Sequence, residues 1–193
     1  MAGGRFTEAP LHRRPEMAFL SSATYYHSAV SPRHRPPRLA RIFYDPPLYF
    51  VTICVRRRVP TLATDRVHLA FRDFAVRGFE ERQIATGRYV IMPDHLHVFV
   101  SGGHEFRLEQ WGRMLKLVLG RATRVVRAAR SGDTAARAVS EVWERGFFDH
   151  VIRSAESYSQ KWEYVRQNPV RGGLVQRVEA WPYQGEIVEL RHD

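Results

Sequence analysis

Two histidines that alternate with apolar residues, His95 and His97, are the side chains in this sequence best suited to hold a metal ion. They begin the run His95-Leu-His-Val-Phe-Val-Ser101, whose β-branched and aromatic residues predict a strand. Residues i and i+2 of a strand point to the same face, so the two imidazoles would project side by side toward one divalent cation. The alternative is a pair of surface histidines on a half-buried strand.

Tyr164 is a candidate nucleophile. It lies in a predicted helix in which Tyr158, Trp162 and Val165 recur at helical spacing and form an apolar face. Tyr164 falls on a more polar face, one turn after Lys161. The alternative is an ordinary tyrosine of an amphipathic helix.

The two candidate features make chemical sense together. Tyrosine is a weak nucleophile at neutral pH because its pKa is ~10. A divalent cation bound to a phosphodiester makes the phosphorus more electrophilic and stabilises the charge that develops in an in-line displacement. A hydrogen bond from Lys161 would also favour the phenolate. The histidine pair and Tyr164 therefore predict phosphoryl transfer at a metal site.

The order of the secondary-structure elements determines how these side chains are positioned. Apolar periodicity predicts strands over residues 49–55, 88–92, 95–101 and 147–152, and helices over about 64–85, 108–130 and 154–168. Gly87 would break the first helix, and Pro169 would stop the last because proline lacks the amide donor. The order predicts an α+β, ferredoxin-like β-α-β-β-α-β fold with an antiparallel sheet, followed by a C-terminal helix that carries the tyrosine.

The charge balance favours a polyanionic partner. Among 193 residues there are 30 Lys and Arg against 20 Asp and Glu, a net charge of +10, which most often indicates nucleic acid. Basic residues gather on one face of the second helix, which is either a solvated surface or a phosphate-contacting one: Arg113, Lys116, Arg124 and Arg127. The single cysteine excludes an internal disulfide, and no apolar run reaches the ~20 residues that span a bilayer. We therefore expect a cytoplasmic protein without a membrane partner.

The chain is expected to begin with an arm. Residues 1–40 hold five prolines and six arginines without a lasting apolar period, which predicts a basic, mostly disordered segment. Residues 41–193 are expected to form a single domain, because that length suits one hydrophobic core.

Four ordered motifs resemble those of one family. Met92-Pro-Asp-His-Leu-His97 resembles the HUH motif, in which a bulky apolar residue separates two histidines. The other three are Tyr49-Phe-Val-Thr52, Trp143-Glu-Arg-Gly-Phe-Phe-Asp-His150 with the following Val151-Ile152-Arg153, and Trp162-Glu-Tyr-Val-Arg-Gln-Asn-Pro-Val-Arg171. From about residue 40 to residue 178 the sequence resembles the REP-associated tyrosine transposases of bacteria, which are single-tyrosine HUH transposases.

The resemblance implies a metal-dependent enzyme of the bacterial cytoplasm and nucleoid that cleaves single-stranded DNA near imperfect palindromic hairpins and rejoins it. Tyr164 takes the position of the nucleophile, which forms a 5′-phosphotyrosine link and frees a 3′-hydroxyl. His95 and His97 take the positions of ligands to Mg²⁺ or Mn²⁺, and Asn168, one turn after the tyrosine, takes that of a third ligand.

The same motifs supply residues for supporting roles. Lys161 is expected to support the tyrosine, and Asp149 and His150 either assist the site or serve packing. Arg153 and Arg171 are expected to contact DNA together with the basic face of the second helix.

Two other functions fit part of the pattern. One is a DNA-hairpin-binding protein that no longer cuts, although a pure binder has no need of His95, His97 and Tyr164 together. The other is a metal-dependent hydrolase that uses activated water, which would form no covalent adduct and would not need the tyrosine. No obligatory protein partner is expected, and the sequence leaves the choice between monomer and dimer open.

Overall fold

A computed structural model of the chain describes residues 46–131 and 142–190. Their elements are β1 (Leu48–Cys54), the 3₁₀ turn η2 (Arg56–Arg58), α1 (Asp65–Arg82), β2 (Ala85–Ile91), β3 (His95–Ser101), α2 (Leu108–Ser131), β4 (Phe148–Ile152), α3 (Ala155–Arg166), α4 (Asn168–Arg171), the 3₁₀ turn η4 (Val178–Ala180) and β5 (Gln184–Glu186). The arm predicted over residues 1–40 lies outside the described residues. No helix within the described ranges is both long and apolar enough to cross a bilayer.

The five strands form one sheet in the order β4-β1-β3-β2-β5, and each neighbouring pair is antiparallel. Elements β1 to β4 with α1 and α2 follow one another in the predicted order, so the predicted ferredoxin-like α+β fold is confirmed. The short strand β5, which the sequence analysis did not predict, pairs with β2 and extends that edge of the sheet.

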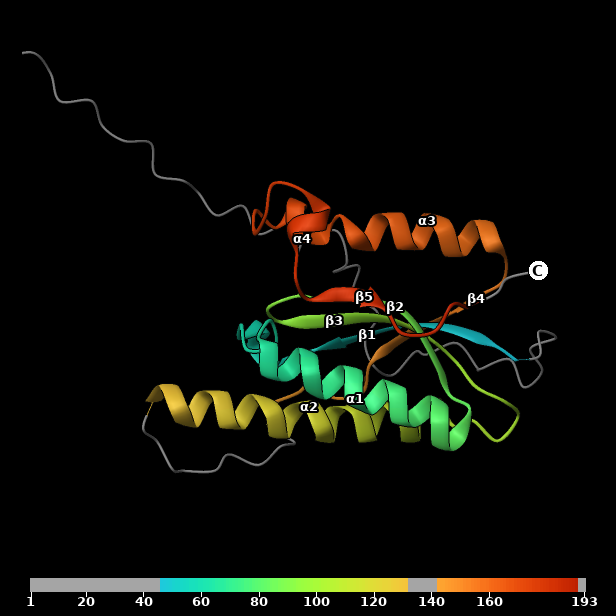
Figure 1. Ribbon diagram of the computed structural model, residues 1–193, viewed down its shortest axis with the longest axis horizontal. Helices are drawn as coiled ribbons and strands as arrows, with labels where there is room; N and C mark the ends of the chain where they lie inside the picture. The colour runs from blue at the N-terminus through green and yellow to red at the C-terminus, as the bar shows by residue number, and fades with distance from the viewer. Residues whose placement is uncertain (1–45, 132–141, 191–193) are drawn as a thin grey trace, which may run out of the picture. The chain divides into compact units, whose positions relative to one another are not determined.

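The two faces of the sheet are covered by different layers (Figure 1). Helices α1 and α2 pack on one face, where the main core includes Val51, Ile53, Phe71, Leu96, Val98 and Leu115. Helix α3 covers the other face, where Tyr158 and Val165 pack with Phe50, Val90 and Phe99. Because strand residues alternate, the face under α3 is also the face to which His95 and His97 point.

The first helix is shorter than predicted. It is capped by Thr64, whose hydroxyl accepts from the Val67 amide at 3.3 Å. It ends at Arg82, because Gln83 adopts a left-handed conformation with φ 53° and ψ 35° and caps the last carbonyls. The prediction that Gly87 breaks the helix was wrong. Gly87 lies inside β2 at an irregularity, where a Cβ would come within 2.4 Å of Leu190.

The last predicted helix is interrupted. Ser154 caps α3 by accepting from the Ser157 amide at 3.1 Å. The helix ends at Arg166, two residues before the predicted stop, and Gln167 separates it from the short helix α4. Pro169 sits in the first turn of α4, where the missing amide donor costs nothing, so the proline starts a helix instead of ending one.

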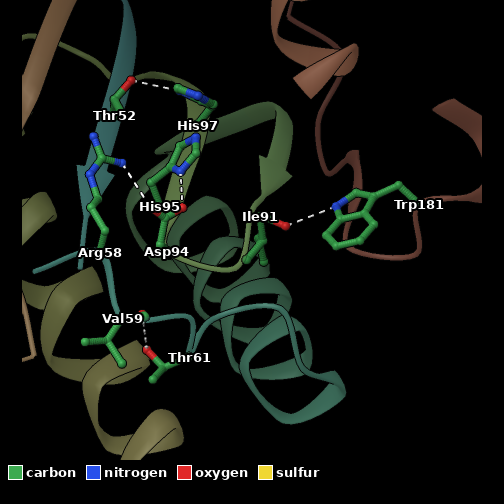
Figure 2. Close-up of polar contacts among 9 residues, drawn as sticks. All are labelled: Thr52, Arg58, Val59, Thr61, Ile91, Asp94, His95, His97 and Trp181. Carbon is green, nitrogen blue, oxygen red and sulfur yellow. Dashed lines mark hydrogen bonds and ion pairs between the residues drawn. The ribbon is translucent and has the colours of Figure 1, made fainter. Parts of the chain in front are cut away.

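The segment after α4 returns to the face under α3. The indole Nε1 of Trp181 donates to the Ile91 carbonyl at 3.0 Å (Figure 2), and the Ile91 amide donates to the Tyr183 carbonyl at 2.8 Å. Trp181 is buried in the cluster under α3. This pair of bonds attaches the C-terminal segment to the end of β2, next to the hairpin that leads into β3.

We expect Trp181→Phe to lower the free energy of unfolding by about 1–3 kcal/mol, because a buried carbonyl would lose its donor. Urea denaturation followed by circular dichroism would measure this loss. Trp162→Phe is the control, since Trp162 packs at the same cluster but is only partly buried. Equal losses in the two variants would show that packing, and not the hydrogen bond, holds this segment.

Candidate active site

The two predicted metal ligands lie side by side at the start of β3. His95 and His97 point to the same face, their ring centroids are 4.7 Å apart, and their planes are nearly perpendicular at 82°. In the antiparallel register, Cys54 and Thr52 of β1 stand opposite them. Both histidines are partly buried, on the side of the sheet that α3 covers.

Each imidazole is oriented by an oxygen that meets its Nδ1 atom (Figure 2). Asp94 Oδ1 lies 2.6 Å from His95 Nδ1, and Thr52 Oγ1 lies 2.8 Å from His97 Nδ1. An ionised carboxylate only accepts, so His95 Nδ1 carries a proton, and in the neutral imidazole Nε2 then keeps a lone pair. When Thr52 accepts in the same way, both Nε2 atoms are available to one cation.

Asp94 is itself held between two partners, Arg58 and His95. Its Oδ2 lies 3.3 Å from Nη1 of Arg58, while its Oδ1 meets His95. Burial by itself would raise the pKa of Asp94, but the hydrogen bond and charge of His95 and the charge of Arg58 together lower it below its usual value. Asp94 is therefore an anion at neutral pH and a firm acceptor for His95.

The environment of His97 keeps that imidazole neutral. Its pKa lies well below the usual value because of burial, and the nearby charges of His95 and Arg58 lower it further. The ring also stacks on Phe50, with centroids 5.5 Å apart and an angle of 17°. Since a metal binds the unprotonated imidazole, His97 is in its ligand form at neutral pH.

Helix α3 brings Lys161 toward the histidines. Lys161 Nζ lies 5.5 Å from the centroid of the Phe50 ring, on which His97 stacks. Tyr158 and Val165 are buried against the sheet, as predicted, and Tyr164 is 43% exposed. The predicted separation of Tyr164 from the apolar face of its helix is therefore confirmed.

Arg171 connects Tyr164 with Asn168. Its guanidinium carbon lies 4.1 Å from the centroid of the Tyr164 ring, within the range of a cation–π contact. Its Nη2 donates to the backbone carbonyl of Tyr164 and to Oδ1 of Asn168. Arg171, predicted to contact DNA, thus occupies the amide oxygen that Asn168 would offer to a metal.

The end of α3 lies at the same end of the sheet as the histidines. A Cβ at Gly172, directly after α4, would be 3.6 Å from the end of the Met92 side chain. The Met92 amide donates to the His95 carbonyl at 2.8 Å, so α4 adjoins the hairpin that leads into β3. Figure 1 shows α3 running along the sheet to α4.

No third side chain forms a metal-binding cluster with the two histidines in the described part of the chain. In the part of the chain that the structure describes, no three His, Cys, Asp or Glu side chains gather closely enough to hold a metal ion. The two imidazoles are the candidate metal donors that the fold brings together, whereas the Asn168 amide oxygen accepts a hydrogen bond from Arg171.

The two predicted supporting residues of β4 point to opposite faces. Asp149 is opposite Val51 of β1, so it faces the α1–α2 layer and is not brought to the histidines. His150 is opposite Phe50, on the face of the histidine pair, and is exposed. Arg153 is exposed directly after β4.

Two of the predicted basic residues of α2, Arg113 and Lys116, lie away from the histidine face. Arg113 is exposed on α2, which covers the other face of the sheet. Lys116 Nζ donates to the carbonyls of Glu144, at 2.8 Å, and Gly146, so this ammonium holds the loop before β4. The side chains of Arg124 and Arg127 lie outside the described residues.

Sequence reasoning missed the residues that orient the histidines. Thr52, Asp94 and Arg58 make these contacts, and two of them lie in the quoted motifs. The available signals were a polar residue in the apolar strand β1 and an aspartate directly before the first histidine. Arg58 had no signal, because only the fold brings it to Asp94.

The loop that supplies Arg58 has an unusual backbone. Arg57 (φ 56°, ψ 21°) and Arg58 (φ 53°) both adopt the left-handed region, which costs a residue with a side chain roughly 1–2 kcal/mol. Hydrogen bonds from the Val55 amide to the Asp94 carbonyl and from the Arg56 amide to the Val142 carbonyl, both 2.8 Å, fix its start. The Arg57 amide donates to Oε1 of Glu144 at 3.2 Å.

No family model matches the sequence. The chain is 24% identical over 138 residues to the REP-associated tyrosine transposase of Escherichia coli K12, covering 70% of this chain and 73% of that protein. A Haemophilus influenzae relative provisionally given the same name is 27% identical over 141 residues, covering 70% of this chain and 77% of the relative.

A solved structure is similar to this chain in fold. The structure of a REP-associated tyrosine transposase bound to a REP hairpin matches with a TM-score of 0.57 at 19% identity, covering 80% of this chain and 94% of that one. The resemblance that the motifs indicate is confirmed: in sequence and in fold, this chain is similar to the REP-associated tyrosine transposases.

Proposed function

We propose that this protein is a metal-dependent single-stranded DNA endonuclease and strand transferase that acts on hairpin-forming sequences through a 5′-phosphotyrosine intermediate on Tyr164. The observation that carries the proposal is the histidine pair, whose two Nδ1 atoms meet oxygen partners on the face that α3 covers. The names of the relatives and the hairpin-bound structure support the same function.

The residues present fit a divalent cation. His95 and His97 would hold Mg²⁺ or Mn²⁺ through their Nε2 atoms. The amide oxygen of Asn168 would become a third ligand once its hydrogen bond from Arg171 is broken. When bound, the cation would polarise the scissile phosphate and stabilise its developing charge. By accepting from the two Nδ1 atoms, Asp94 and Thr52 would hold the rings in the tautomers that this role requires.

Tyr164 would supply the nucleophile. Its phenolic oxygen forms a bond to phosphorus and the bond from phosphorus to the 3′-oxygen breaks. The proton lost by the phenol is balanced by one gained by the leaving 3′-oxygen, which becomes the 3′-hydroxyl. Lys161 contributes positive charge on the same helix. Because the phosphotyrosine conserves the energy of the phosphodiester, a 3′-hydroxyl can reverse the step and rejoin DNA without a nucleotide cofactor.

The first test is a denaturing gel of the full chain with labelled single-stranded hairpin DNA, with and without Mg²⁺ or Mn²⁺. We expect a metal-dependent covalent band that Tyr164→Phe abolishes. Tyr158→Phe is the matched control on the same helix, because burial raises the pKa of Tyr158 to about 12 and this phenol packs against Phe99. The control should keep the band.

Two outcomes would contradict this assignment. Cleavage that survives in Tyr164→Phe would show that another group is the nucleophile, or that activated water cuts the strand. Tight hairpin binding by the wild type without any covalent band would instead favour a hairpin-binding protein that no longer cuts.

A second test addresses the metal directly. We expect Asp94→Asn to weaken Mn²⁺ binding about 10–100-fold, since an amide holds the His95 tautomer less firmly than a carboxylate does. Electron paramagnetic resonance of free Mn²⁺ would give the dissociation constants. Asp73→Asn, an exposed aspartate on α1, is the control and should leave the affinity unchanged. Equal affinities in all three proteins would contradict a role of Asp94 at a metal site.

A further inference from the structure

Three consecutive arginines, Arg56, Arg57 and Arg58, form the exposed turn η2 directly after β1. Among the described residues, Arg56 and Arg57 make no side-chain ion pair, and Arg58 pairs with Asp94 alone. Two carboxylates also contact the turn, because Glu144 Oε1 accepts from the Arg57 amide at 3.2 Å and Asp94 pairs with Arg58. Three guanidinium groups against two carboxylates leave an excess of positive charge, which favours an anion.

This arginine turn adjoins the histidine pair. The Val55 amide donates to the Asp94 carbonyl, and Nη1 of Arg58 lies 3.3 Å from Oδ2 of the same aspartate. Asp94 in turn meets His95 at 2.6 Å (Figure 2). Asp94 therefore links the arginine turn to His95.

The backbone of the turn is held in a conformation that arginine disfavours. Arg57 and Arg58 are left-handed, where glycine would be free of strain. Bonds from neighbouring segments keep them there, including that from the Arg57 amide to Glu144. Strain of this kind is concentrated at functional sites.

We propose that Arg56, Arg57 and Arg58 form a phosphate-binding turn that holds the backbone of single-stranded DNA beside the histidine pair. Guanidinium groups match phosphate in charge and in their planar set of donors. Arg58 can bridge Asp94 and a phosphate, because its Nη1 donates to Asp94 and its other N–H groups can donate to the phosphate. The identity of the ligand as DNA rests on the proposed function, whereas the contact to phosphate depends only on the turn.

Substitutions at Arg57 distinguish the effect of the guanidinium charge on binding from the effect of the left-handed backbone on stability. Arg57→Gly removes the guanidinium and relieves the left-handed strain, so the variant should melt at the same or a higher temperature than the wild type. Arg57→Ala removes the guanidinium and keeps the strain, and Arg57→Lys keeps a positive charge. Arg82→Ala is the matched control, because Arg82 is an exposed arginine at the end of α1. The strand that follows begins at Ala85, which pairs with Ser101, at the opposite end of β3 from His95.

The measurement is fluorescence anisotropy of labelled oligothymidine with the full chain, over a range of salt concentrations and without metal. One lost phosphate contact should lower the slope of log affinity against log salt by about 0.7, and weaken binding about fivefold near 0.1 M salt. We expect both effects in Arg57→Gly and Arg57→Ala, recovery of the slope in Arg57→Lys, and neither effect in Arg82→Ala.

Several results would overturn the phosphate-binding turn. They are an unchanged slope in Arg57→Gly and Arg57→Ala, an equal loss in Arg82→Ala, or no binding of oligothymidine by the wild type. The covalent-band assay tests the proposed function separately. A covalent band together with an unchanged slope in the Arg57 variants would contradict the phosphate-binding turn and support the strand transferase. A lowered slope without a covalent band would support the turn and contradict the strand transferase.

Discussion

The antiparallel register between β1 and β3 is the constraint on which the rest of the candidate site depends. It sets Thr52 opposite His97 and Cys54 opposite His95. Side chains alternate along a strand, so a shift of one residue would turn both imidazoles into the α1–α2 core. The apolar residues that alternate with them, Leu96 and Val98, are completely buried in that core and hold the register in place.

Strand β1 therefore serves two layers at once. Val51 and Ile53 contribute to the core under α1 and α2, while Phe50 and Thr52 support His97 from the other side. The end of the strand leads into the arginine turn, whose last residue reaches Asp94. Packing on one face thus fixes the positions of polar groups on the other, and no separate scaffold is needed for the site.

The C-terminal helices α3 and α4 carry the other candidate residues, Tyr164 and Asn168. Tyr158 and Val165 anchor α3 on the sheet, and this burial leaves Tyr164 on the outward side. The break at Gln167 lets Arg171 fold back onto the ring of Tyr164 and the amide of Asn168. The candidate nucleophile and the candidate third ligand are therefore held relative to each other by one guanidinium.

The sequence by itself determined what depends on local periodicity: the strand of His95 and His97 with its bounds, the order of the elements up to α3, and the outward position of Tyr164. Only the tertiary structure decided what depends on partners distant in the chain. It turned Asp149 away from the histidines, and it committed the Lys116 ammonium to backbone carbonyls. It also added β5 and ended α1 early through the left-handed cap at Gln83. Strand register, caps and long-range hydrogen bonds join residues whose spacing in the sequence carries no periodic signal, which is why they could not be predicted.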